Sequence, residues 1–132
     1  MLSGFVVHYH NELNYDIDFK IKNGNCQSNK YFYYCLQDID SKPEILESIS
    51  YRCRLHGIHL KKDKKRKNNY HVELEICTLI NKQDGWINLR LLRIDRFKRA
   101  LVEIYLQDSN SEQQNLTTYL LEKYPHIYEV YP

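Results

Sequence analysis

The chain has 132 residues, of which 42% are hydrophobic and 27% charged, a balance typical of one globular domain rather than a disordered chain. Its formal net charge of +2 is too small to indicate nucleic-acid binding by itself, although residues 61–67 (KKDKKRK) concentrate six positive charges and one negative charge. The four cysteines have no CxxC spacing, which excludes a zinc ribbon and a thioredoxin-type motif.

No targeting or membrane-spanning segment is visible in the sequence. The N-terminus lacks the basic start and apolar core of a signal peptide, and no apolar run is long enough to cross a bilayer. We therefore expect an intracellular protein of the cytoplasm or nucleus, or a virion component, that is neither secreted nor bound to a membrane.

The first half of the chain favours extended structure, because its apolar, aromatic and β-branched residues alternate with polar ones. Strands are expected over residues 5–9, 15–22, 30–37 and 45–58. Asn23 and Gly24 predict a tight turn between two of them. Pro43 indicates a turn or a sheet edge over residues 40–44.

The second half changes period after the basic run. Val72, Ile76 and Ile80 lie at helical spacing and predict a helix, which Asp84 and Gly85 end. Apolar residues also alternate at positions 72, 74 and 76, so a strand is a local alternative to the helix. Residues 86–94 and 99–106 predict two further strands, and the leucines at 116, 120 and 121 predict a short helix before Pro125.

This order of elements predicts an α+β, mostly β fold. Strands followed by a helix, two strands and a second helix suit a small OB-fold-like five-stranded barrel with two or three helices packed at its ends. We expect one compact domain, with an extra strand or hairpin at the N-terminus.

Three segments carry a resemblance to a known family. Residues 54–58 (RLHGI) match the pattern RLxGI, residues 95–105 (DRFKRALVEIY) follow a DKYGR-like turn, and residues 115–123 (NLTTYLLEK) form a leucine-rich helix. Together they resemble the end of the third strand, the turn with the strand leaving it, and the final helix of the staphylococcal nuclease (thermonuclease) family, including relatives carried by large DNA viruses. The resemblance implies a barrel domain over residues 31–132, preceded by an N-terminal β extension over residues 1–30.

The resemblance also implies a phosphodiester-cleaving site. The family uses one calcium ion held by carboxylates, a glutamate that acts on the attacking water, and two arginines that grip the phosphate. Arg54 and Arg99 fall on these two arginines, and a planar guanidinium matches phosphate oxygens well. Lys98 replaces the glycine that is usual in the DKYGR turn, so the resemblance leaves the turn geometry open.

The family's acidic residues are mostly replaced. Where the family reads Asp-Thr-Pro-Glu after Gly-Ile, this chain has His59 at the metal aspartate and Lys62 at the glutamate base. A neutral imidazole suits transition metals better than calcium, and a protonated lysine cannot accept a proton from water. These two substitutions argue against ordinary nuclease activity.

Two pairs of aspartates are candidates for the family's earlier Asp-Gly-Asp-Thr metal motif. Asp38 and Asp40 are favoured by their spacing from Arg54. Asp18, with its neighbour Asp16, is the runner-up, because it precedes an alternating strand. Calcium is expected only if this metal site is retained, and otherwise no cofactor is expected.

The sequence therefore predicts a degenerate nuclease that binds nucleic acid or phosphate without cleaving it. The basic run would add contacts to DNA or RNA through Lys61, Lys62, Lys64, Lys65, Arg66 and Lys67. Two alternatives remain open. One is a structural or interaction module, for example a virion or complex component that docks protein partners through residues 1–30. The other is an active metal-dependent endonuclease with altered ligands such as His59 and Asp40.

Overall fold

The computed structural model describes residues 2–22, 46–62, 69–107 and 112–131. Their elements are β1 (Leu2–Asn11), β2 (Asn14–Lys22), β3 (Leu46–Leu55), β4 (Ile58–Leu60), α2 (Tyr70–Lys82), β5 (Trp86–Ile94), β6 (Ala100–Gln107), β7 (Gln113–Asn115), α3 (Leu116–Lys123) and β8 (Tyr128–Val130). The strand predicted over 30–37, the turns predicted at 23–24 and 40–44, and the candidates Asp38, Asp40, Lys64, Lys65, Arg66 and Lys67 lie outside the described residues.

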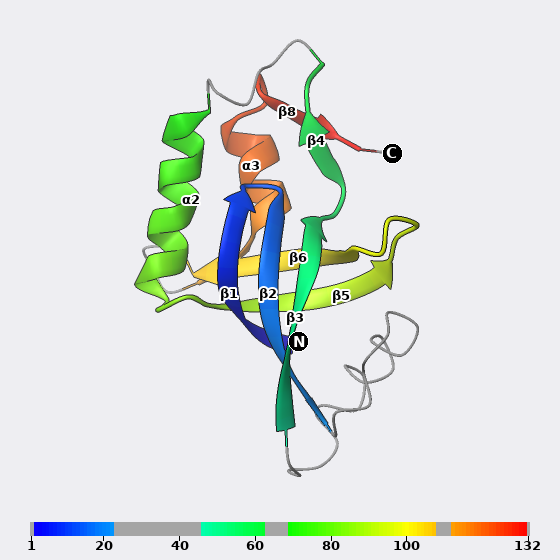
Figure 1. Ribbon diagram of the computed structural model, residues 1–132. Helices are drawn as coiled ribbons and strands as arrows, with labels where there is room; N and C mark the ends of the chain where they lie inside the picture. Colours follow the sequence, from blue (N-terminus) through cyan, green and yellow to red (C-terminus); the bar gives the residue numbers. More distant parts are fainter. Residues whose placement is uncertain (1, 23–45, 63–68, 108–111, 132) are drawn as a thin grey trace.

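Five strands close into a barrel. β1 pairs antiparallel with β2 and β5, β2 with β3, and β5 with β6, and a parallel pairing between β3 and β6 completes the ring. In Figure 1, β1, β2 and β3 run across β5 and β6. The prediction of a small, mostly β, OB-like barrel is confirmed, with two helices in the described part of the chain. Within these ranges, neither helix is long and apolar enough to cross a membrane.

The N-terminal strands belong to the barrel itself. β1 pairs with β5 from Leu2 opposite Leu89 to Phe5 opposite Trp86, while β2 pairs with β3 along its whole length. The first 22 residues therefore supply two of the five barrel strands, which differs from the predicted division into an extension over 1–30 and a barrel over 31–132. Pairing between strands about 80 residues apart leaves no local signal in the sequence.

The core follows the alternation of the strands. Tyr15, Ile17 and Phe19 of β2 are fully buried, whereas Asp16 and Asp18 point to the outer face. Each such buried apolar side chain contributes roughly 1.5–3 kcal/mol relative to exposure. Next to them pack Val72, Ile76 and Ile80 of α2, which confirms the helical spacing.

A polar cluster ties α2 to α3. The carboxylate of Glu75 accepts hydrogen bonds from the hydroxyls of Tyr119 and Tyr124 and from the ammonium of Lys123. Burial alone would raise the pKa of Glu75, but these hydrogen bonds lower it below its usual value. α3 is thereby held where Thr117 can donate a hydrogen bond to the carbonyl of His56, in the turn between β3 and β4 (3.0 Å).

We expect Glu75→Gln to lower the free energy of unfolding by about 1–3 kcal/mol near neutral pH, because three donors lose an ionised acceptor. The folded-state pKa of Glu75 is lowered, so its contribution is present above the unfolded pKa of about 4.3 and is lost as the pH falls through the folded value. Urea unfolding at about pH 7 and about pH 3 should show the deficit at the first pH and a smaller one at the second. Glu122→Gln, an exposed position on α3, is the control. An equal deficit at both pH values would contradict an ionised Glu75.

Candidate functional site

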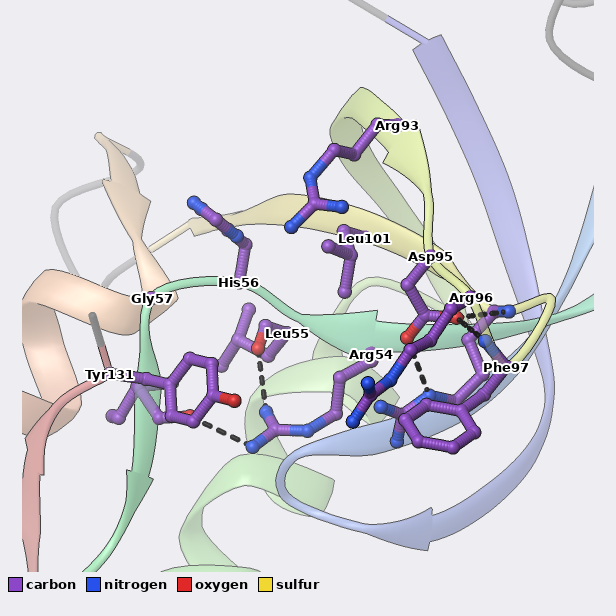
Figure 2. A pocket seen from close by; sticks show the side chains of 12 residues that line it. Arg54, Leu55, His56, Gly57, Arg93, Asp95, Arg96, Phe97, Leu101 and Tyr131 are labelled. Atoms are coloured by element: carbon purple, nitrogen blue, oxygen red, sulfur yellow. Dashed lines mark hydrogen bonds and ion pairs between the residues drawn. The ribbon is translucent and has the colours of Figure 1, made fainter.

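A cavity of about 470 Å³ opens where three segments meet: the turn between β3 and β4, the hairpin between β5 and β6, and the chain after β8 (Figure 2). Four arginines and one carboxylate are among its described lining residues. The lining consists of Arg54, Leu55, His56, Gly57, Ile58, Arg93, Asp95, Arg96, Phe97, Arg99, Leu101 and Tyr131.

Asp95 organises the hairpin between β5 and β6. Its Oδ1 accepts hydrogen bonds from the backbone N–H groups of Phe97 (2.9 Å) and Arg99 (2.8 Å), and its Oδ2 accepts one from Nε of Arg99 (3.0 Å). Burial alone would raise the pKa of Asp95, but the hydrogen bonds from Arg99 and Phe97 lower it. The carboxylate is therefore committed to the turn.

Lys98 keeps the tight turn despite its side chain. Its φ of 65° lies in the left-handed region, where glycine is usual, and its N–H donates to the carbonyl of Asp95 (3.0 Å). A non-glycine residue thus holds the left-handed position of this turn, at the cost of local backbone strain.

Two guanidinium groups lie against the ring of Phe97. The guanidinium carbon of Arg96 is 4.8 Å from the ring centroid, and that of Arg99 is 5.4 Å from it. Such cation–π contacts restrict the conformations of a long side chain. Phe97 therefore helps to hold both charges at the cavity.

Arg54 closes the turn between β3 and β4. Its guanidinium donates to the carbonyls of Leu55 (2.6 Å) and Ile58 (2.9 Å), around Gly57 with its φ of 83° (Figure 2). Tyr131 adds a backbone hydrogen bond to the carbonyl of Gly57 (3.0 Å). Arg54 is thus part of the scaffold of the cavity as well as part of its surface.

Arg54 and Arg99 line the same cavity, together with Arg93 and Arg96, which the sequence motifs do not single out. On β5 the residues Ile87 and Leu89 face the core, and unbroken alternation would send Arg93 inward as well. The register shift between Leu91 and Arg93 adds one residue and turns Arg93 outward. The feature of the sequence that could have indicated Arg93 and Arg96 is the basic composition of residues 93–99.

His59 lies beside the cavity and not in its lining. On β4 it pairs with Glu129 of β8, with Nε2 3.0 Å from Oε1, and its ring meets the ring of Tyr131 edge-on at 5.2 Å. Lys61 and Lys62 follow β4, and the backbone N–H of Lys61 donates to the carbonyl of Ile127 (2.9 Å). Neither lysine lines the cavity.

Asp18 lies on β2 between Phe5 and Ser50, outside the cavity lining. Its neighbour Asp16 is paired with Arg52 (2.6 Å) and His10 (2.9 Å) on the outer face. Within the described part of the chain, no three His, Cys, Asp or Glu side chains are grouped so that they could hold a metal ion.

Comparisons of the chain with family models, with curated proteins and with solved structures found no match.

Replacing Lys98 by glycine should stabilise the protein by about 0.5–1 kcal/mol. Relief of the left-handed conformation is worth roughly 1–2 kcal/mol, of which the greater unfolded-state freedom of glycine removes about 0.4–1 kcal/mol. Urea denaturation is the measurement, with Lys98→Ala as the matched control, because it removes the charge but keeps the strain. If the glycine variant were no more stable than the alanine variant, the strain at this position would not exceed the unfolded-state cost of glycine, about 0.4–1 kcal/mol.

We expect Arg54→Ala to destabilise the fold by about 2 kcal/mol, because it removes a charged donor from the carbonyls of Leu55 and Ile58. Arg93→Ala should stay within about 0.5 kcal/mol of the unmodified chain, because Arg93 is exposed and contacts no described residue through a hydrogen bond or ion pair. Thermal and urea unfolding of the two variants test the contrast. Equal destabilisation by the two substitutions would show that Arg54 is not a scaffold residue.

Proposed function

We propose that this chain is a staphylococcal-nuclease-like domain that has lost hydrolysis and binds the phosphates of nucleic acid through the arginine cavity. The observation that carries the proposal is the charge of the described lining: Arg54, Arg93, Arg96 and Arg99 against Asp95 alone. A cavity with this excess of guanidinium groups attracts phosphate and repels cations.

The state of Asp95 argues for binding over cleavage. This one carboxylate among the described lining residues is held by two backbone N–H groups and Arg99, so it is not available to take a proton from water. Its lowered pKa points in the same direction, because a weaker base accepts a proton less readily. His59 and Lys62, at the family's acidic positions, are outside the lining.

Nucleic acid is the favoured partner because its charge is repeated along a chain. OB-like barrels present strand faces and turns to oligonucleotides, and single strands track grooves that carry positive charge. Lys61 and Lys62 directly follow β4, whose first residue, Ile58, lines the cavity. The contacts predicted for residues 64–67 concern residues outside the described part of the chain.

The alternative of a protein-docking module is less favoured than the sequence alone suggested. It rested on residues 1–30 as an added segment and on the replaced acidic residues. The first of these two grounds is weakened, because residues 2–22 are largely used in barrel pairing. An active phosphodiesterase with altered metal ligands would need Asp40, outside the described residues, to join His59, which is already paired with Glu129.

Labelled single-stranded DNA should bind with an affinity that falls steeply with salt, and should not be cleaved with calcium, manganese, zinc or chelator. The double variant Arg93→Gln with Arg96→Gln should weaken binding at least about tenfold. It should also flatten the slope of log affinity against log salt by about 0.7 for each phosphate that is no longer neutralised. Fluorescence anisotropy over a salt series measures both quantities.

Arg90→Gln is the matched control, because Arg90 is an exposed arginine of the same strand that does not line the cavity. Cleavage that disappears with chelator and with His59→Ala would assign an active metal-dependent endonuclease instead. Salt-independent binding, or none, would favour the structural or interaction module.

A further inference from the structure

The arginine cavity carries more charge than one phosphodiester can neutralise. Its described lining has four guanidinium groups and one carboxylate, so the arginines exceed the carboxylate by three positive charges. A phosphodiester brings one negative charge, whereas a phosphate monoester brings about 1.5–2 at neutral pH because its second pKa is about 6. The charge balance therefore fits a monoester, which occurs at the end of a strand, better than an internal linkage.

The four arginines differ in how much of their hydrogen-bonding capacity the fold already uses. Arg54 donates to two backbone carbonyls, and Arg99 donates through Nε to Asp95. Within the described part of the chain, Arg93 makes no hydrogen bond or ion pair, and Arg96 has a cation–π contact with Phe97. Among the described residues, nothing accepts a hydrogen bond from these two exposed guanidinium groups, so their donors can reach a ligand.

A terminal phosphate offers more acceptor oxygens than an internal diester. The cavity lining presents guanidinium groups from the turn between β3 and β4 and from the hairpin between β5 and β6 (Figure 2). The three unesterified oxygens of a terminal phosphate accept from several guanidinium groups at once.

Asp95 does not offer a place for a divalent cation. Its oxygens already accept three hydrogen bonds from donors within its own turn, and Nε of Arg99 lies 3.0 Å from Oδ2. Four neighbouring guanidinium groups repel a cation further. Positive charge that a metal ion would otherwise supply is present in the side chains themselves.

We propose that the cavity binds the terminal phosphate monoester of a nucleic-acid strand without a divalent metal ion, and that Arg93 is the residue that selects the doubly charged group. The proposal rests on the proposed function, since it names the part of the nucleic acid that the same site binds. Arg93 adds charge and an uncommitted donor fork to a cavity that Arg54 and Asp95 build.

Three probes of one short single-stranded sequence test the proposal: one with a 5′-phosphate, one with a 3′-phosphate and one with hydroxyl ends. In the presence of EDTA we expect at least one phosphorylated strand to bind about ten- to a hundredfold more tightly than the hydroxyl strand, the range expected for one or two charge-assisted contacts. Added calcium should not increase this ratio. A preference that appears only with calcium would overturn the metal-independent part of the proposal.

The pH dependence has a predictable sign. Between about pH 5 and pH 7 the monoester loses its second proton, so the ratio of phosphorylated to hydroxyl affinity should rise with pH. Asp95, with its lowered pKa, and the arginines keep their charges in this range. His56 also lines the cavity, and repeating the series with the variant His56→Gln isolates the contribution of the ligand to the pH dependence.

Arg93→Gln should abolish most of the preference for the phosphorylated strand while leaving thermal unfolding unchanged, and Arg90→Gln should retain the preference. Arg93→Lys should restore part of it, because it returns the charge without the planar fork. Equal affinity of the unmodified chain for all three probes would overturn this inference and leave the proposed function standing. Failure of all three probes to bind at low salt would overturn the proposed function as well.

Discussion

The parallel pairing between β3 and β6 is the constraint on which the rest of the molecule depends. It spans residues 53–55 and 100–102, and it joins strands that no hairpin could bring together. By placing Arg54 opposite Leu101, it brings the turn after β3 next to the hairpin before β6. Without this short ladder the barrel would remain an open sheet, and the arginines of the two turns would not share one cavity.

Polar contacts hold the two turns that border the cavity. On one side Asp95 accepts hydrogen bonds from the backbone of its turn and from the side chain of Arg99. On the other, Arg54 crosses its turn to reach the carbonyls of Leu55 and Ile58. Behind that turn α3 contributes Thr117, and the cluster around Glu75 fixes α3 to α2. The helices thus act on the site through backbone positions and not through ligand contacts.

Local sequence patterns predicted most helices and strands, but they did not predict the pairing of strands that are far apart in the sequence. Helical spacing in α2 and alternation in β5 and β6 are properties of neighbouring residues, and the structure contains all three elements. The place of β1 in the barrel depends on Phe5 meeting Trp86, which no local period encodes. The resemblance to a family added a division at residue 30 that the strand pairing does not follow. The same limit applies to the candidate site, where the outward direction of Arg93 depends on one extra residue in β5.

The two arginines that a motif picks out are also the two that the fold needs. Arg54 donates hydrogen bonds across the turn between β3 and β4, and Arg99 donates to Asp95 in the hairpin between β5 and β6. These structural contacts account for both arginines even in a chain that binds no ligand. Arg93 is in a different position. It is exposed, lines the cavity and makes no hydrogen bond or ion pair with the described residues, so the fold gives no reason for a guanidinium there. Because a cluster of like charges costs free energy unless an anion offsets it, Arg93 supports a phosphate ligand more strongly than Arg54 and Arg99 do.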